Sequence, residues 1–204
     1  MRRVAGADEA GRGALAGPLV VAAVCLDVGR LSARTRRALS ALNDSKLVSS
    51  ATRDELASVL WRDADRVVVR MASSRSIDRD GLHRTNLRLL RESLSALEAR
   101  AGALLVDGFS LGAEAPAHHA LVRGDGLSAS VAAASIIAKT VRDRLMRGAA
   151  AEQYPAYRFD RHVGYGTAEH LARIETHGPC AIHRQSFRWG SGSSDQSEKP
   201  PSPG

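Results

Sequence analysis

Acidic side chains follow three apolar runs whose composition is typical of β-strands. These side chains are Asp8, Glu9, Asp107 and Asp125. Strand ends at one edge of an α/β sheet converge on the crevice where ligands bind. Carboxylates gathered there repel one another unless cations lie among them, and such hard oxygen ligands suit Mg²⁺ or Mn²⁺. Two such ions about 3.5–4 Å apart can hold the attacking and leaving oxygens of a phosphodiester, so the pattern favours metal-dependent hydrolysis.

The same acidic residues also have a purely structural interpretation. Asp-Gly pairs form turns, and that is the commoner role for Asp107 or Asp125 taken alone. Neighbouring residues of a strand point to opposite faces, so Asp8 and Glu9 share a site only where the strand ends or bulges. Glycines on both sides of Arg12 are harder to explain by a turn alone. They let the backbone approach a ligand closely, while the guanidinium supplies a charged fork.

The elements that position these residues alternate between strands and helices. Apolar, β-rich runs predict strands at residues 4–7, 19–26, 66–71, 103–106 and 120–122. Helical periodicity and helix-start signals predict helices at residues 34–42, 50–61, 78–99, 128–146 and 168–175. The continuous run 19–26 is typical of a strand covered on both faces. A helix between the third and fourth strands implies that these two strands form a parallel pair, within a mixed α/β sheet flanked by helices.

The composition narrows the class of protein. The 204 residues carry a formal net charge of +7, which favours nucleic acid as a partner, although an arginine-rich proteome would give the same balance. No apolar run reaches the roughly 20 residues of a membrane helix. Two cysteines make no disulfide framework and the N-terminus does not fit a signal peptide, so we expect a cytoplasmic protein. We expect one domain over residues 1–188 and a flexible Gly-, Ser- and Pro-rich tail over residues 189–204.

Several sequence blocks, in order across residues 4–187, are similar to those of bacterial ribonuclease HII. The blocks are Gly6–Gly13 with Gly17-Pro18, Leu42–Lys46, Val106–Gly108, Gly124-Asp125, Ala132–Lys139 with Arg142-Asp143, Gly164–Thr167 and His183–Phe187. The resemblance implies the ribonuclease H fold, a mixed five-stranded sheet flanked by helices, with a C-terminal helical extension. It also implies Mg²⁺- or Mn²⁺-dependent endonucleolytic cleavage of RNA in RNA–DNA hybrids. Single ribonucleotides embedded in duplex DNA would be incised on their 5′ side, with 5′-phosphate and 3′-hydroxyl products.

The resemblance assigns roles to individual positions. Four active-site acids would hold the metal ions, and they match Asp8, Glu9, Asp107 and Asp125. Gly11-Arg12-Gly13 matches the loop that family members place at the junction between ribonucleotide and deoxyribonucleotide. Tyr165 matches the tyrosine that packs on the sugar beside that junction. Such contacts agree with the physical chemistry, because the 2′-hydroxyl is what distinguishes RNA from DNA at a site.

Further polar residues are candidates for phosphate contacts. Ser45 and Lys46 either hydrogen-bond a backbone phosphate or form a loop before a helix. Lys139, Ser135 and Arg142 share one helix face, which either follows the phosphate backbone or is an ordinary solvated face. Both interpretations remain open at this point.

Other nearby residues carry separate predictions. Asp143 is interpreted as an ion-pair or capping partner of Arg142. Val163 stands where many relatives have a lysine, so a phosphate contact is missing there or is supplied by Arg161. His183 and the other histidines show no metal-ligand spacing and are interpreted as surface or core residues.

Two other functions fit the same features. A Holliday-junction resolvase of the same fold would use similar acids without needing a 2′-hydroxyl. A non-catalytic nucleic-acid-binding module would bind without metal-dependent cleavage, although clustered carboxylates would repel phosphate. Of the three, the sequence favours a monomeric two-metal endoribonuclease acting on RNA–DNA hybrids and on duplex DNA that contains ribonucleotides.

Overall fold

The computed structural model describes residues 3–27, 29–40, 50–122, 124 and 128–189. Four predictions therefore lie outside the described residues: those for Ser45, for Lys46, for Asp125 and for the tail over 190–204. Among the residues that are described, no helix has the length and apolarity needed to cross a membrane.

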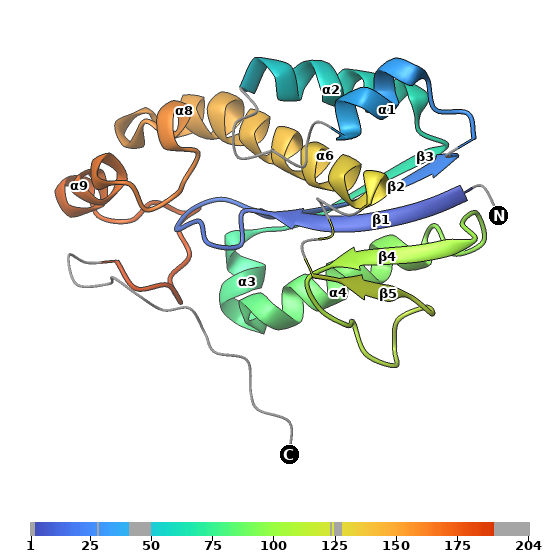
Figure 1. Cartoon of the computed structure of the whole chain (residues 1–204). Coiled ribbons are helices and arrows are strands. Elements are labelled where there is room, and N and C mark those ends of the chain that lie inside the picture. The colour runs from blue at the N-terminus through green and yellow to red at the C-terminus, as the bar shows by residue number, and fades with distance from the viewer. Residues whose placement is uncertain (1–2, 28, 41–49, 123, 125–127, 190–204) are drawn as a thin grey trace.

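Five strands form one mixed sheet in the order β3-β2-β1-β4-β5 (Figure 1). Their bounds are β1 Arg3–Ala10, β2 Leu19–Asp27, β3 Arg66–Ala72, β4 Ala103–Asp107 and β5 His119–Leu121. Pairing is antiparallel between β1 and β2 and between β2 and β3, and parallel between β1 and β4 and between β4 and β5. All five strand predictions and the mixed α/β class are confirmed. The predicted pairing of the third and fourth strands is wrong, because β2 and β1 lie between them.

Helices cover both faces of the sheet (Figure 1). The helices on one face are α1 Ala33–Ser40, α2 Ser50–Asp63 and α6 Ala129–Leu145, and those on the other are α3 Ser74–Asp80 and α4 Leu82–Ser95. The side chains of β2 alternate between two cores, with Ala22 and Val24 against α6 and Val21 and Ala23 against α4. This double burial explains why the β2 sequence is apolar at nearly every position.

The α6 helix lies directly on β1 because Gly6 has no side chain. A Cβ at Gly6 would collide with the main chain at Ser130 and Val131, in the first turn of the helix. This contact fixes the start of α6 against the strand that carries Asp8 and Glu9.

The single long helix predicted at residues 78–99 is two helices. Between α3 and α4 lies Gly81, whose φ of 83° is outside the helical region and suits glycine. The predicted apolar face is nevertheless buried, with Leu90 and Leu94 fully enclosed against the sheet. The apolar periodicity was therefore correct, but one glycine divides the helix.

The C-terminal extension is built from short elements that the sequence pattern does not resolve. A π-helical turn at Met146–Ala150 continues α6, and after it come α7 Ala151–Gln153, a 3₁₀ turn at Pro155–Tyr157, α8 Phe159–His162 and α9 Ala168–His177. Of these, only the last helix was predicted. The extension packs against the loop between β1 and β2, where Ala16 and His183 form a β-bridge.

Candidate active site

The carboxylates of Asp8 and Glu9 lie where β1 loses one of its two neighbouring strands. Pairing with β4 ends at Ala7, whereas pairing with β2 continues in regular register to Ala10. The strand therefore neither ends nor bulges between Asp8 and Glu9, and it ends one residue later, at Ala10. The main-chain N–H of Glu9 donates to the Asp8 carboxylate at 2.7 Å. Because β4 does not pair with β1 beyond Ala7, the consecutive residues Asp8 and Glu9 both lie beside an unpaired side of the strand.

Asp8 and Glu9 have different surroundings because they point to opposite faces of the sheet. Asp8 lies toward α6 and accepts a hydrogen bond from Ser135. Glu9 lies toward α4, beside Asn86, and its carboxylate is 3.7 Å from the Arg12 guanidinium. The strand therefore places its two acids against two different helices.

Asp107 ends β4 and completes a group of three carboxylates. Its Oδ1 accepts a hydrogen bond from the main-chain N–H of Gly124 at 2.6 Å, next to the position of Asp125 in the sequence. Burial is the main cause that raises the pKa of Asp8 from 3.8 to about 7, and the charges of Glu9 and Asp107 contribute to the same shift. Burial also raises the pKa of Glu9, although Arg12 opposes that shift. Negative charge is thus crowded at this edge.

The carboxylate oxygens are the donor type that hard divalent cations prefer. Among the described residues, no three His, Cys, Asp or Glu side chains form a group able to hold a metal ion. Mg²⁺, however, usually keeps several waters and is bound by one or two carboxylates together with substrate phosphates. The donor type of these acids therefore fits a divalent cation, and the described residues by themselves form only part of such a site.

Gly11 and Gly13 differ in what requires them. Gly11 has φ of 90°, and a Cβ there would collide with the guanidinium of Arg142. Gly13 is exposed, lies outside the positive-φ region and has no atom within 4 Å of a Cβ position. The fold therefore requires glycine at position 11, whereas at position 13 the missing side chain leaves open space in front of the backbone.

The residue that precedes Tyr165 binds the main chain of the Gly11–Pro18 loop. The carbonyl of the preceding Gly164 accepts hydrogen bonds from the N–H groups of Leu15, at 2.8 Å, and Ala16, at 3.2 Å. The Lys139 ammonium is 4.8 Å from the centroid of the Tyr165 ring. The structure therefore brings together the loop, Tyr165 and Lys139, which come from three separate parts of the sequence.

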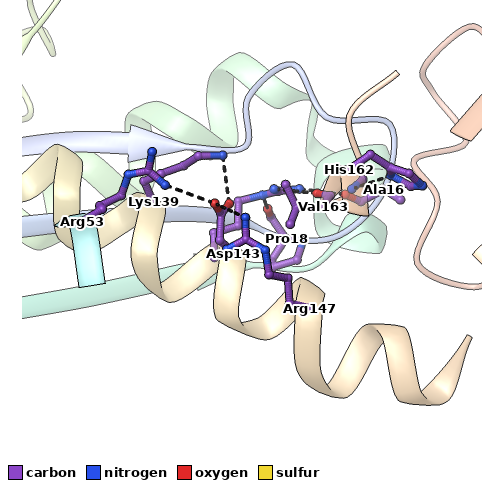
Figure 2. Close-up of polar contacts among 10 residues, drawn as sticks. Ala16, Pro18, Arg53, Lys139, Asp143, Arg147, His162 and Val163 are labelled. Carbon is purple, nitrogen blue, oxygen red and sulfur yellow. Dashed lines mark hydrogen bonds and ion pairs between the residues drawn. The ribbon is translucent and has the colours of Figure 1, made fainter. Parts of the chain in front are cut away.

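Arg142 does not lie on a phosphate-binding face. Its side chain is fully buried, and it donates to main-chain carbonyls rather than facing solvent. The predicted pairing of Asp143 with Arg142 is also wrong. Asp143 instead pairs with Lys139 at 2.9 Å and with Arg53 and Arg147 at 3.6 Å each (Figure 2). Lys139 is thus the residue of that helix which is both partly exposed and next to Tyr165.

Comparison with known proteins identifies the family. The model of the family described as Ribonuclease HII matches residues 5–189. The chain belongs to this family. It is 47% identical over 184 residues to the ribonuclease HII of Xanthobacter autotrophicus, covering 90% of this chain and 70% of that protein.

Solved structures of the type 2 enzymes share the fold. RNase HII of Archaeoglobus fulgidus, solved in a complex with PCNA, superposes with a TM-score of 0.74 and 26% identity, covering 93% of this chain and 97% of that one. Bst-RNase HIII in complex with Mn²⁺ superposes with a TM-score of 0.64 and 23% identity, covering 86% and 63%. As a ribonuclease HII, the protein is an endoribonuclease, a hydrolase of RNA in RNA–DNA hybrids.

Sequence reasoning missed several residues that shape the ribonuclease HII site. Asn86 is a fully buried polar residue beside Glu9, and its position in the apolar stripe of α4 was the signal that could have revealed it. Arg184 is fully buried against the Gly11–Pro18 loop, but no local pattern marks it as buried.

Val163 is buried in the C-terminal core with φ of 46°, and its carbonyl accepts a hydrogen bond from Arg142. Its side chain therefore does not reach solvent, whereas Arg161 is exposed.

Proposed function

We propose that this ribonuclease HII cuts the RNA strand of RNA–DNA hybrids and also incises duplex DNA on the 5′ side of a single embedded ribonucleotide. The products would carry 5′-phosphate and 3′-hydroxyl ends. One observation carries the proposal: buried, mutually repelling carboxylates at the open edge of β1 lie directly before a glycine loop that packs against Tyr165. A group of carboxylates for binding cations is thus adjacent to main-chain groups for contacting a sugar.

The carboxylates would hold the metal ions. Asp8, Glu9, Asp107 and Asp125 would bind two Mg²⁺ or Mn²⁺ ions, which lower the pKa of an attacking water and neutralise the leaving 3′-oxygen. The raised pKa of Asp8 supports this, because crowded anions are relieved by bound cations. Ser135 orients the Asp8 carboxylate by a hydrogen bond, and Gly124 does the same for Asp107.

Selectivity would come from the loop and from Tyr165. Main-chain groups of Gly11, Arg12 and Gly13 would contact the 2′-hydroxyl, the group that distinguishes RNA from DNA. The open space at Gly13 supports such a close approach. The Tyr165 ring would pack on the neighbouring deoxyribose, where a 2′-hydroxyl would clash.

Basic and hydroxyl side chains would bind the phosphate backbone. Lys139, held beside Tyr165 by its ion pair with Asp143, would contact a phosphate near the junction. Ser45 and Lys46 would contact further phosphates. We also propose that residues 1–188 act as one catalytic domain, in a monomer located in the cytoplasm, where the free thiols of Cys25 and Cys180 persist.

The test is cleavage of a duplex DNA that contains one ribonucleotide, with Mg²⁺ or Mn²⁺ present. The expected result is one incision immediately 5′ to the ribonucleotide, and an all-DNA duplex of the same sequence serves as the uncut control. An intact strand under both metals contradicts the proposal. Cleavage of an all-DNA four-way junction, without cleavage of a hybrid, would instead indicate a junction resolvase.

A further inference from the structure

Two arginine side chains are fully buried beneath the Gly11–Pro18 loop, and the mechanism above uses neither of them. They are Arg142, on α6, and Arg184, in the segment that follows α9. A guanidinium stays charged and carries five N–H donors, so burying it is costly unless acceptors replace water around it. What accepts from these donors therefore indicates what the arginines are for.

The Arg184 guanidinium binds carbonyl groups at both ends of the loop. One Nη donates to the carbonyl of Gly11 at 2.7 Å and to that of Gly17 at 3.1 Å, while the other donates to Arg12 at 2.9 Å. Its Nε also donates to Gly17, and its main-chain N–H donates to the carbonyl of Leu15 at 2.8 Å. A residue near the C-terminus thus holds the first and last glycines of the loop.

Arg142 holds the other side of the same loop. It donates to the carbonyls of Ala16 at 2.9 Å, Pro18 at 3.0 Å and Val163 at 2.9 Å. Gly11 permits this arrangement, because any Cβ there would collide with the Arg142 side chain. The two guanidinium groups together bind most of the carbonyls of the loop from beneath.

The hydrogen bonds of Arg184 fix the direction of two peptide planes. A trans peptide is planar, so the carbonyl of one residue and the N–H of the next point in opposite directions. The carbonyls of Gly11 and Arg12 point toward Arg184, and the N–H groups of Arg12 and Gly13 therefore point away from it. Within the described part of the chain, neither N–H donates to an acceptor. Two adjacent donors are thus presented outward, beside the open space at Gly13.

We propose that Arg184 is a positioning residue for substrate recognition, which turns the N–H groups of Arg12 and Gly13 toward the ribonucleotide by holding the carbonyls of Gly11 and Arg12. This inference rests on the proposed role of the loop in recognising the 2′-hydroxyl. The turn that carries Arg184 is itself fixed, because the Asp78 carboxylate accepts hydrogen bonds from the N–H groups of Gln185 at 3.0 Å and Ser186 at 2.9 Å. The C-terminal segment thus sets the geometry of a loop near the N-terminus.

The test compares the affinities of two duplexes that differ in one hydroxyl group. Binding of a DNA duplex with one ribonucleotide, and of the same duplex made wholly of DNA, is measured with Ca²⁺ in place of the catalytic metal. The wild type should bind the ribonucleotide duplex more tightly. Arg184→Met should lower that affinity ratio by about tenfold, the effect of one well-placed hydrogen bond. Loss of folded protein alone would weaken both affinities equally and leave the ratio unchanged.

Control variants separate the possible outcomes. Arg188→Met makes the same change at an exposed arginine four residues further on, and it should keep the wild-type ratio. A wild-type ratio in Arg184→Met, or an equal loss in Arg188→Met, overturns the proposal. A wild-type protein that binds the two duplexes equally contradicts the role of the loop itself, and that failure is visible before any variant is compared.

A second variant keeps the test valid if Arg184→Met does not fold. Arg184→Lys retains the charge but loses the planar guanidinium with its several N–H donors. The ratio of the affinities for the two duplexes should therefore fall by a smaller factor than in Arg184→Met. Hydrogen exchange of the loop amides should be faster in this variant, because the N–H of Ala14 donates to the carbonyl of Gly11, which Arg184 holds, and the N–H of Gly17 donates to the carbonyl of Ile182, two residues before Arg184. Unchanged exchange together with an unchanged ratio would overturn the proposal.

Discussion

The ends of strands β1 and β4 and the neighbouring Gly11–Pro18 loop each bury side chains of like charge, but the two regions differ in what surrounds those charges. At the ends of β1 and β4, the charges of Asp8, Glu9 and Asp107 repel one another, and this repulsion adds to the cost of burial. Under the loop, Arg142 and Arg184 also lie close enough for their charges to interact, yet each donates to at least three carbonyl groups.

This contrast indicates which region is complete without a ligand. Protein carbonyls satisfy the buried cations, so the loop is preorganised by the chain itself. The acids also have partners in the protein, among them Arg12 beside Glu9 and the N–H of Gly124 at Asp107, yet the pKa values of Asp8 and Glu9 remain raised. This difference supports the proposal that the acids bind metal ions and that the loop recognises substrate by a fixed shape.

The largest expected effect is that of Asp8→Asn, which removes one charge from the edge. Hybrid cleavage should fall by at least about 10²-fold, as when other preorganised charged or polar groups are removed from active sites. The metal-free protein should nevertheless become more stable at pH 8, by up to about 4 kcal/mol, because the native pKa of Asp8 is about 7 rather than 3.8. Cleavage assays and urea unfolding in EDTA measure the two effects.

The sign of that stability effect defines its pH window. An acid whose native pKa is raised destabilises the fold as pH rises from about 4 to about 7, so the gain in Asp8→Asn should grow across that range and stay constant above it. Asp160→Asn is the matched control, because Asp160 is exposed on α8. A stability loss in Asp8→Asn at pH 8 would contradict the raised native pKa of Asp8.

Alanine at the two loop glycines should separate the requirements of folding from those of recognition. Gly11→Ala should lower the free energy of unfolding by about 2 kcal/mol or more, because it combines a positive φ with a collision against Arg142. Gly13→Ala should change stability by less than about 0.5 kcal/mol but raise the KM for a single-ribonucleotide duplex. Denaturant unfolding and steady-state kinetics provide both numbers. Equal destabilisation by the two substitutions would contradict the distinction.

Stability at acid pH should depend on His170, which belongs to the C-terminal extension. Its Nδ1 donates to the carbonyl of Tyr165 at 2.9 Å, and its Nε2 lies 3.1 Å from Nε2 of His183. The Nδ1 of His183 accepts from the N–H of Cys180 at 2.9 Å, so His183 carries its proton on Nε2 and donates it to His170. Protonating His170 would set two N–H groups against each other.

The resulting pH dependence runs opposite to that of Asp8. Burial lowers the pKa of His170 from 6.5 to about 4, so stability should fall by up to about 3 kcal/mol as pH drops from 6.5 to 4. His170→Asn keeps a donor for the Tyr165 carbonyl and should show a shallower loss over that range. Thermal or urea unfolding at several pH values measures the difference, and parallel curves would exclude His170 as the titrating group.

The smallest expected effect is that of Tyr165→Ala on substrate preference. Loss of the ring should lower kcat/KM for a single-ribonucleotide duplex by about tenfold, a typical effect of losing one stacking contact. A long RNA–DNA hybrid should lose less, because it offers no adjacent deoxyribose at most positions. Parallel kinetics on both substrates report the ratio, and equal losses would exclude a role for Tyr165 at the junction.

Local patterns in the sequence were sufficient for the strands and for the nature of the site. The continuous apolar run of β2 reflects burial on both faces, and acids at strand ends indicate a sheet-edge site whatever the order of the strands. The strand pairing that leaves Asp8 and Glu9 together beside the end of β4 was not predictable. It depends on β4 pairing only as far as Ala7, a register that no local signal encodes.

The buried arginines show most clearly what local patterns miss. Arg142 follows the helical spacing of a solvated face, and its acceptors at Ala16 and Pro18 lie more than 120 residues away in the sequence. Those acceptors are main-chain carbonyls, which every residue carries, so composition gives no hint of them. The division of the predicted helix at Gly81 has a similar cause, because one backbone angle outweighs an unbroken apolar stripe.

We infer that the carboxylates at the ends of β1 and β4 perform the chemistry while the loop and basic residues hold the substrate. Asp107→Asn separates these two roles, in single-turnover cleavage of an RNA–DNA hybrid with saturating Mg²⁺ and in binding of the same hybrid. Cleavage should be lost while the Kd stays within about threefold of wild type, because the proposed phosphate contacts lie elsewhere. Retained turnover, or loss of binding equal to the loss of cleavage, would contradict it.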